Sequence, residues 1–177
     1  MEDLSLHILD IVENSVAAEA NNIKIDIKED ELKDLLSVEI SDNGKGMDQD
    51  QLKEVLDPFF TTKTSRRFGL GLSLLAEAAK SANGSLSINS AVGKGTTIKA
   101  EFQHSHIDCK PIGDMAQTII SLIMGNPEIN LIYTHQKNHR KYRLDTRKIQ
   151  ASLESKSINS PEGIRMLREN LKDLHKQ

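Results

Sequence analysis

The stretch DNGKGM, residues 42–47, directly follows an alternating apolar run over residues 36–40. Such alternation predicts a half-buried strand, so Asp42 should lie at the end of that strand, with the two glycines in the turn beyond it. A carboxylate at this place can accept a hydrogen bond from an exocyclic amine, and Gly44 and Gly46 let the backbone approach a flat ring closely. Because Asp-Asn-Gly is also a common turn, the neighbouring segments must decide between the two interpretations.

Upstream, residues 4–20 have apolar side chains at helical spacing and predict a helix. Asp10 and Asn14 are four residues apart, so they share one face of it. A carboxylate and an amide oxygen that project together suit a hard cation such as Mg²⁺, which takes oxygen ligands. A solvated polar stripe would explain an isolated pair, but Glu13 adds a third polar side chain to an otherwise apolar helix.

Downstream, the segment DPFFTTKTSRRFGLGLS, residues 57–73, predicts a polar, basic loop that enters a helix. Small residues before a helix expose backbone N–H groups, and the helix dipole favours an anion there. Lys63 adds positive charge to the same loop. A surface loop with a glycine hinge is the alternative, and the segment matches neither of the common glycine fingerprints.

A fourth segment, GKGTT at residues 93–97, lies between two alternating apolar runs. It predicts a hairpin turn. Thr96 or Thr97 could also face the pocket beside Asp42.

Together these segments resemble the ATP-binding domain shared by gyrase B subunits, Hsp90, histidine kinases and MutL proteins, which is the GHKL superfamily with the Bergerat fold. Residues 13–25 look most like the gyrase and MutL form of the first segment. Residues 57–72 and 93–97 look most like a histidine kinase. The resemblance covers residues 4 to about 103 in the family's order and spacing, and it implies ATP and Mg²⁺ as ligands.

The resemblance implies a role for each matching residue. Asn14 would ligate the Mg²⁺ that bridges the phosphates, and Asp42 would take the adenine amine. The adenine pocket would be shaped by Gly44, Gly46 and Met47, and its purine side completed by Thr96 or Thr97. The phosphates would be held by the lid, through Lys63, Gly69, Leu70, Gly71 and Leu72.

Asp10 occupies the position at which ATPases of the family carry a glutamate that orients the attacking water. An aspartate is one methylene shorter, which reduces its reach toward the γ-phosphate. Glu13 is the alternative base, although it lies one residue from Asn14 and so points to a different sector of the helix.

Composition predicts one ordinary domain with a small appendage. Cys109 is the single cysteine, which excludes an internal disulfide and fits a reducing compartment. No apolar run approaches the length of a membrane span and no signal peptide is evident, so we expect a cytoplasmic protein without membrane contact.

Charge is uneven along the chain. Residues 1–60 carry 16 Asp+Glu against 5 Lys+Arg, a balance of −11, whereas residues 61–177 carry 10 against 18, a balance of +8. Part of the positive half is a cluster at residues 137–148. A solvated hairpin explains this cluster as well as nucleic-acid contact does, and the scarcity of aromatics near it disfavours nucleic acid. An acidic partner, or the acidic first half, suits the cluster better.

The expected fold is α/β, a two-layer sandwich of a mixed β-sheet with helices on one face. Residues 1–107 would form the ATP-binding domain and residues 108–177 an α+β extension. The first part should begin with a helix at 4–20, ended by Asn21-Asn22, and continue with strands near 23–28 and 36–42 that a charged turn at 29–33 joins. A helix near 49–56 should follow, with a capping box at Asp48 and Gln51. After it we expect a helix to about 82 and strands near 85–90 and 96–104. In the second we expect a helix from Lys110 to Gly125, strands near 129–135 and 140–145, and a last helix that starts at Ser160-Pro161.

Two classes of function fit these features. The first is an enzyme that hydrolyses ATP or phosphorylates a separate protein in trans, with anti-sigma-factor kinases as a related case. The second is a non-catalytic, ATP-controlled switch that acts on a protein partner. In either class the partner or phosphoacceptor is unidentified, and the apolar stripe of the last helix is core or, alternatively, a partner or homodimer seam.

Overall fold

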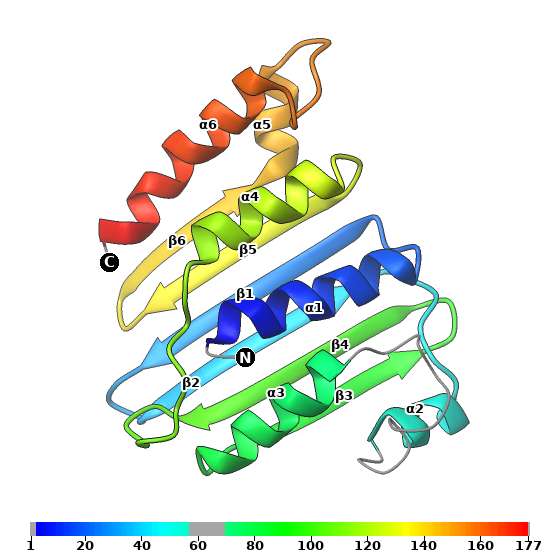
Figure 1. Cartoon of the computed structure of the whole chain (residues 1–177), viewed down its shortest axis with the longest axis vertical. Coiled ribbons are helices and arrows are strands. Elements are labelled where there is room, and N and C mark those ends of the chain that lie inside the picture. Colours follow the sequence, from blue (N-terminus) through cyan, green and yellow to red (C-terminus); the bar gives the residue numbers. More distant parts are fainter. Residues whose placement is uncertain (1–2, 57–69, 177) are drawn as a thin grey trace.

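The computed structural model describes residues 3–56 and 70–176 and contains one six-stranded sheet (Figure 1). In chain order the elements are α1 (Leu4–Ala17), β1 (Asn22–Asp30), β2 (Leu35–Asp42), α2 (Gln49–Leu56), α3 (Leu70–Ser81), β3 (Ser85–Ala91), β4 (Gly95–Gln103), α4 (Met115–Gly125), β5 (Asn130–Lys137), β6 (Arg140–Asp145), α5 (Thr146–Ser152), α6 (Pro161–Leu171) and a 3₁₀ helix (Lys172–Lys176). The strand order is β3-β4-β2-β1-β5-β6. Only the β1–β5 pairing in this sheet is parallel, so the sheet is mixed as expected.

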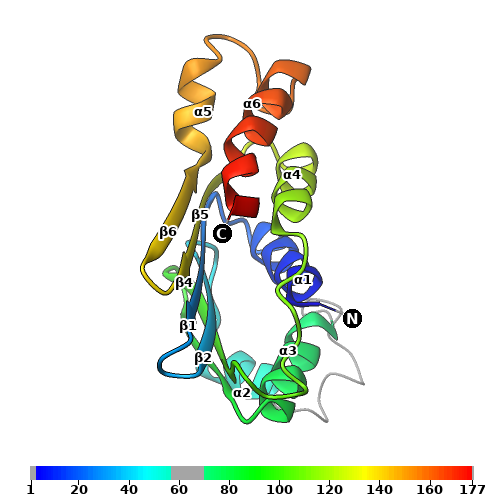
Figure 2. The same cartoon turned by 90° about the vertical axis from the view of Figure 1, so that its left-hand side faces the viewer.

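The helices α1, α3 and α4 cover one face of the sheet (Figure 2). Alternation along β1 explains this layering, because Ile23, Ile25 and Ile27 are buried toward the helices while Lys24 and Lys28 are exposed on the other side. The expected two-layer α/β sandwich is therefore confirmed, and its core lies between this sheet face and the helices.

Residues after 107 continue the same sheet. β5 pairs in parallel with β1, and β6 then forms the outer edge. α4 lies beside α1, and α6 packs on α4. The division at residue 107 stays a prediction, but the hydrogen-bonded sheet runs across it without a break.

α1 ends three residues earlier than expected. Glu19 adopts a left-handed conformation (φ 63°), and the backbone N–H of Ala20 donates to the carbonyl of Ser15 at 3.0 Å. This is a Schellman-type stop, with the buried Ala20 following it. The predicted stop at Asn21-Asn22 is wrong, because the backbone N–H groups of both residues donate instead to the side-chain oxygen of Asn43.

The charged turn predicted at 29–33 is also displaced. β1 runs on to Asp30, and Glu29 is buried in it with 8% of its surface exposed. Its carboxylate is satisfied by His135 of β5 at 2.7 Å, which is a long-range partner that the local sequence does not reveal. The turn follows, with Asp34 at φ 51°.

α4 begins at Met115, although a helix from Lys110 was expected. The carbonyls of Pro111 and Ile112 accept from the first backbone N–H groups of α1, those of Leu4 (2.9 Å) and Ser5 (2.8 Å), and so cannot enter a helix of their own. Two other predicted starts are confirmed. Asp48 and Gln51 form the reciprocal capping box of α2, and Ser160 caps α6 with Pro161 at its first position.

Candidate functional site

Asp42 ends β2 on the helix-covered face of the sheet, and its carboxylate is held from three directions. Oδ1 accepts from the backbone N–H of Gly44 at 2.8 Å and of Thr96 at 3.3 Å. Oδ2 accepts from the hydroxyl of Ser15 on α1 at 2.7 Å. An ionised carboxylate offers about four acceptor positions, so three are used and one on Oδ2 is left for a ligand donor.

The turn after Asp42 is packed tightly against β3 and β4. Gly46 has a φ of +67°, and a Cβ there would lie 1.9 Å from the carbonyl oxygen of Ala91. Only glycine combines that conformation with that closeness. Gly44 is buried against Ala18, at the end of α1. These two positions bring the backbone of the turn close to α1 and to the β3–β4 hairpin.

Met47 is buried beside this turn, with 5% of its surface exposed. Its backbone N–H donates to the hydroxyl of Ser90 at 2.9 Å, and the same hydroxyl lies 2.9 Å from that of Thr96. Ser90 therefore joins the Met47 turn to β4. Thr96 pairs with Asp42 in register and shares its face, whereas Thr97 points to the open face of the sheet. Of the two candidate threonines, Thr96 is the one near Asp42.

The three candidate polar residues of α1 differ in their burial. Asp10 and Asn14 are half-buried, and Glu13 is exposed. Asp10 lies directly against Gly71 of α3, since a Cβ on that glycine would be 2.6 Å from the Asp10 Cβ and 2.7 Å from its Oδ2. The absence of a side chain at Gly71 thus leaves the space that the Asp10 carboxylate occupies.

The remaining lid candidates are placed only in part. Lys63 and Gly69 lie outside the described residues, and of Leu70 only its position as the first residue of α3 is described. Gly71 is buried beside Asp10. Leu72 is 7% exposed and belongs to the hydrophobic core, so its side chain packs α3 against the interior.

Two residues of this site were not expected from the sequence. Ser15 and Ser90 orient Asp42 and Met47 through side-chain hydrogen bonds across 27 and 43 residues of chain. Ser15 has a weak local signal, because it lies on the face of α1 that also carries Ile11 and Val12 and is one of its buried polar residues. Ser90 has none, since its role depends on strand register.

The donor set on α1 fits a magnesium ion. Asn14 offers an amide oxygen and Asp10 a carboxylate, four residues apart and both half-buried. Mg²⁺ takes hard oxygen ligands, binds through one or two protein groups and keeps water or phosphate oxygens at its other positions.

The fold is that of an α/β domain of the ATP-binding GHKL superfamily. The chain belongs to the histidine kinase-, DNA gyrase B- and HSP90-like ATPase family, whose model matches residues 2–106.

Several relatives agree with this assignment. The sensor protein DegM of Bacillus sp. (strain B21-2) is 35% identical over 91 residues, which are 51% of this chain and 24% of DegM. The sensor histidine kinase YxdK of Bacillus subtilis (strain 168) is 31% identical over 106 residues, which are 56% of this chain and 32% of YxdK. The chain therefore spans a third or less of the length of each of these two relatives.

Among solved structures, the N-terminal domain of a DNA repair protein superposes with a TM-score of 0.59 at 20% identity. The match covers 82% of this chain and 53% of that one, so it supports the fold beyond the family's own residues. Within the described residues, none of the helices is both long enough and apolar enough to cross a bilayer.

Proposed function

We propose that this protein binds ATP with Mg²⁺ and transfers the γ-phosphate, to water or to a separate protein in trans. The observation that carries the proposal is the Asp42 carboxylate, which is fixed by Ser15, Gly44 and Thr96 and keeps one acceptor position open. The relative named as a sensor histidine kinase, YxdK, supports phosphate transfer as the chemistry.

Asp42 recognises the base in this proposal. The open position on Oδ2 accepts one hydrogen of the adenine 6-amine, while Gly44 and Gly46 hold the turn beside it close to Ala18 and Ala91. Guanine carries a carbonyl at the same position of the ring and so offers no donor. Met47 supplies an apolar wall next to the base.

The residues proposed to act on the phosphates lie on α1 and at the start of α3. Mg²⁺, bound through Asn14, would supply positive charge between the phosphates. Phosphoryl transfer depends mainly on positioning and charge stabilisation. Asp10 contributes to positioning, because its side chain is held against Gly71. The Asp10 carboxylate orients a nucleophilic water or hydroxyl at the phosphate. Glu13 is exposed, which makes Asp10 the stronger candidate of the two.

The lid and the partner complete the proposal. Lys63 and Gly69 would hold the phosphates from the loop before α3. A protein partner or phosphoacceptor would approach from outside, with the extension formed by residues 108–177 as its contact or as a homodimer element. The basic residues at 137–148 suit an acidic protein surface better than nucleic acid.

Base recognition is tested by comparing Asp42→Asn with wild type in calorimetric titrations with ATP and with GTP. We expect Asp42→Asn to weaken ATP binding by at least about tenfold, because the amide turns a donor toward the Ser15 hydroxyl or toward the adenine amine. Wild type should bind ATP more tightly than GTP. Glu39→Gln is the matched control, since Glu39 lies on the same strand but on the open face. Equal ATP affinity in wild type and Asp42→Asn would refute the role of Asp42.

A further inference from the structure

The strand β6 forms one outer edge of the sheet and lies beyond the residues that the family model matches (Figure 1). An edge strand presents backbone N–H and C=O groups that can pair with a strand of another chain. The two outer strands differ in charge. β3 has the uncharged sequence SLSINSA, whereas β6 carries three basic residues, Arg140, Lys141 and Arg143.

The hydrogen bonds of β5 determine which residues of β6 face the free edge. At the two ends of β5, the backbone N–H groups of Asn130 and Asn138 donate toward β1, each to a carbonyl at 2.8 Å. The N–H of Leu131 donates the other way, to the hydroxyl of Thr146 just after β6, at 2.9 Å. Because backbone groups alternate along a strand, the odd-numbered residues of β5 are the ones that bond toward β6.

The backbone groups of Lys141 and Arg143 therefore point away from the sheet. The odd-numbered residues of β5 pair with Arg140, Tyr142 and Leu144, so these three use their backbone groups for β5. Lys141 and Arg143 lie between them and turn their N–H and C=O groups to the free edge. Within the described residues, these outward groups make no hydrogen bond.

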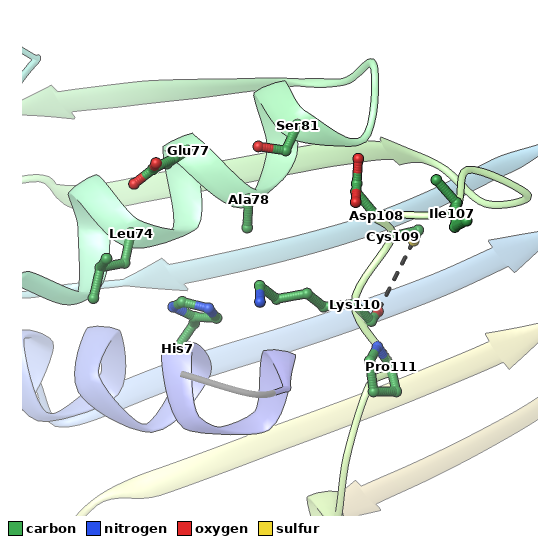
Figure 3. Close-up of a pocket in the computed structure, with 10 residues that line it drawn as sticks. All are labelled: His7, Leu74, Glu77, Ala78, Ser81, Ile107, Asp108, Cys109, Lys110 and Pro111. Carbon is green, nitrogen blue, oxygen red and sulfur yellow. Dashed lines mark hydrogen bonds between the residues drawn. The ribbon is translucent and has the colours of Figure 1, made fainter.

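The side chains of Lys141 and Arg143 lie on the face of the sheet opposite the helices. Tyr142 and Leu144 alternate with them and belong to the core side. Both basic side chains are exposed, and none of the described helices lies over their face (Figure 2). The cavity of about 640 Å³ between α1, α3 and residues 107–111 is on the helix-covered side and is separate from this edge (Figure 3).

The edge has an excess of positive charge. One carboxylate, that of Asp145, lies on the same face and accepts two hydrogen bonds from the Arg147 side chain, at 2.9 and 2.7 Å. These bonds lower the pKa of Asp145, and the charge of Arg143 adds to the effect. With Lys141 included, the balance of these four residues is +2. On the same face β5 adds no charge, and the charges of β1 sum to zero, from Lys24, Asp26, Lys28 and Asp30.

The helix-covered side of β6 suits an uncharged neighbour. The hydroxyl of Tyr142 donates to the carbonyl of Asn170 at 3.2 Å. Burial raises the pKa of Tyr142 to about 12, and the nearby charge of Asp173 acts in the same direction. A strand beside β6 would therefore carry acidic residues toward one face and uncharged residues toward the other, which is the alternation of an extended segment.

From the outward backbone groups and the two exposed charges, we propose that β6 binds an extended acidic segment of a protein partner as an additional antiparallel strand. Antiparallel pairing places a Glu or Asp directly opposite Lys141 and another opposite Arg143, and each of these pairs exchanges two backbone hydrogen bonds. A second copy of β6 would place like charges opposite each other, which disfavours a homodimer through this edge.

The inference rests on the proposed function for the existence of a protein partner, but the contact itself requires no nucleotide. Its test therefore uses the whole chain without ATP, and phosphate release is measured separately. Loss of one result leaves the other standing.

The probe is a capped octapeptide of alternating glutamate and threonine. Binding is measured by calorimetric titration, and amide hydrogen exchange by NMR in the same samples. We expect binding at peptide concentrations up to about 1 mM. Exchange of the Lys141 and Arg143 amides should slow by at least about tenfold, because both become hydrogen-bonded. The Tyr142 amide, which already bonds to β5, should change little.

Methylation of peptide nitrogens separates strand addition from attraction between charges alone. Methyl groups on the glutamate nitrogens remove the donors that face β6 and should weaken binding by at least about tenfold. Methyl groups on the threonine nitrogens lie on the opposite edge of the peptide and should have a much smaller effect. The peptide with lysine in place of glutamate should not bind.

Variants locate the contact on β6. Lys141→Gln and Arg143→Gln should each weaken binding by about threefold, and the double variant by about tenfold, as for exposed ion pairs. Lys28→Gln is the matched control, because Lys28 is exposed on the same face and in register with Lys141, but two strands further in. It should bind like wild type. The unfolding temperature of each variant shows that the fold is kept.

Five results would overturn the proposal. The peptide does not bind up to about 1 mM; it binds without slower exchange at Lys141 and Arg143; the two methylated peptides bind alike; the double variant binds like wild type; or slower exchange appears in β3 instead. Tighter binding of single-stranded oligothymidylate than of the peptide at these residues would assign the edge to nucleic acid and overturn it as well.

Discussion

At the scale of single residues, one carboxylate organises the proposed ATP site. Asp42 receives donors from α1, from its own turn and from β4, so its orientation depends on three separate parts of the chain. A group held in this way discriminates well, because a ligand without a matching donor leaves its one open acceptor position unpaired.

Gly71 is a second residue on which the proposed chemistry depends. Gly71→Ala would place a methyl group 2.6 Å from the Asp10 Cβ and so must displace the Asp10 side chain. We expect turnover of ATP to fall on the order of a hundredfold, as for other small misplacements of a catalytic group, with a smaller change in ATP affinity. Steady-state phosphate release and calorimetric ATP titration measure the two effects separately.

Gly125→Ala is the control for this substitution, because a Cβ at Gly125 meets nothing within 4 Å. It should leave turnover unchanged. Wild-type turnover in Gly71→Ala would show that the position of Asp10 does not matter to the reaction.

The positions of Asp42 and Gly46 in the fold could be predicted from the sequence, because each residue carries a local signal. Asp42 follows an alternating strand pattern, and Gly46 combines a turn with a close approach that only glycine allows. The partners of Ser15 and Ser90 could not be predicted, because they are distant in the chain and depend on the fold. The choice of Thr96 over Thr97 needed that same register.

At the scale of elements, Glu29 joins the two parts of the sheet. Its carboxylate contacts His135 on β5 at 2.7 Å and His104, just after β4, at 3.1 Å. The hydrogen bond from His135, with those from His104 and the charge of Lys137, lowers the pKa of Glu29 from 4.5 to about 2. The ionised form is therefore favoured by the fold.

This contact predicts an acid-dependent loss of stability. A carboxylate with a lowered folded-state pKa stabilises the protein fully above its unfolded-state pKa and loses that effect as the pH falls toward its folded-state pKa. Between about pH 4.5 and 2, Glu29 should account for a loss of up to about 3 kcal/mol in the free energy of unfolding. Glu29→Gln should show a correspondingly flatter pH dependence in urea unfolding.

Glu54→Gln serves as the control, because Glu54 is exposed on α2. It should follow the wild-type curve. The interpretation fails if Glu29→Gln has the same pH dependence as wild type over this window.

The packing of α6 on α4 gives a second prediction at this scale. Leu167 is fully buried and belongs to the core, so the apolar stripe of α6 serves the interior of this chain. Leu167→Ala should lower the free energy of unfolding by about 2–5 kcal/mol, from lost burial and the cavity left behind. Arg165→Ala, on the exposed side of the same helix, should change it by less than about 0.5 kcal/mol. A near-zero effect of Leu167→Ala in chemical unfolding would mean that α6 is not held against α4.

Element types were predictable where periodicity and caps agree, as at α2 and α6. The predicted helix and strand boundaries were wrong where a residue distant in the chain binds a backbone group or a charged side chain. The first backbone N–H groups of α1 donate to the carbonyls of Pro111 and Ile112, so α4 starts later than expected. The hydrogen bond to His135 keeps Glu29 within β1. Neither contact can be predicted from the secondary-structure propensity of the local sequence.

At the scale of the whole molecule, one sheet unites the family domain with residues that lie beyond the family match. The family covers residues 2–106, and β5 then pairs with β1 along its length. A partner that contacts β5 would therefore touch a strand that lies directly beside β1 and two positions from β2, the strand that carries Asp42.

The most direct test of the central claim follows the γ-phosphate. The purified chain is incubated with γ-labelled ATP and Mg²⁺, beside Asp10→Asn and Asn14→Ala, and released phosphate and labelled protein are both measured. We predict release by wild type that is lost in both variants, Asn14→Ala through weakened Mg²⁺–ATP binding and Asp10→Asn with ATP binding retained. Tight ATP binding by wild type with neither phosphate release nor labelled protein would contradict autonomous turnover, and release that persists in Asp10→Asn would remove Asp10 from the reaction.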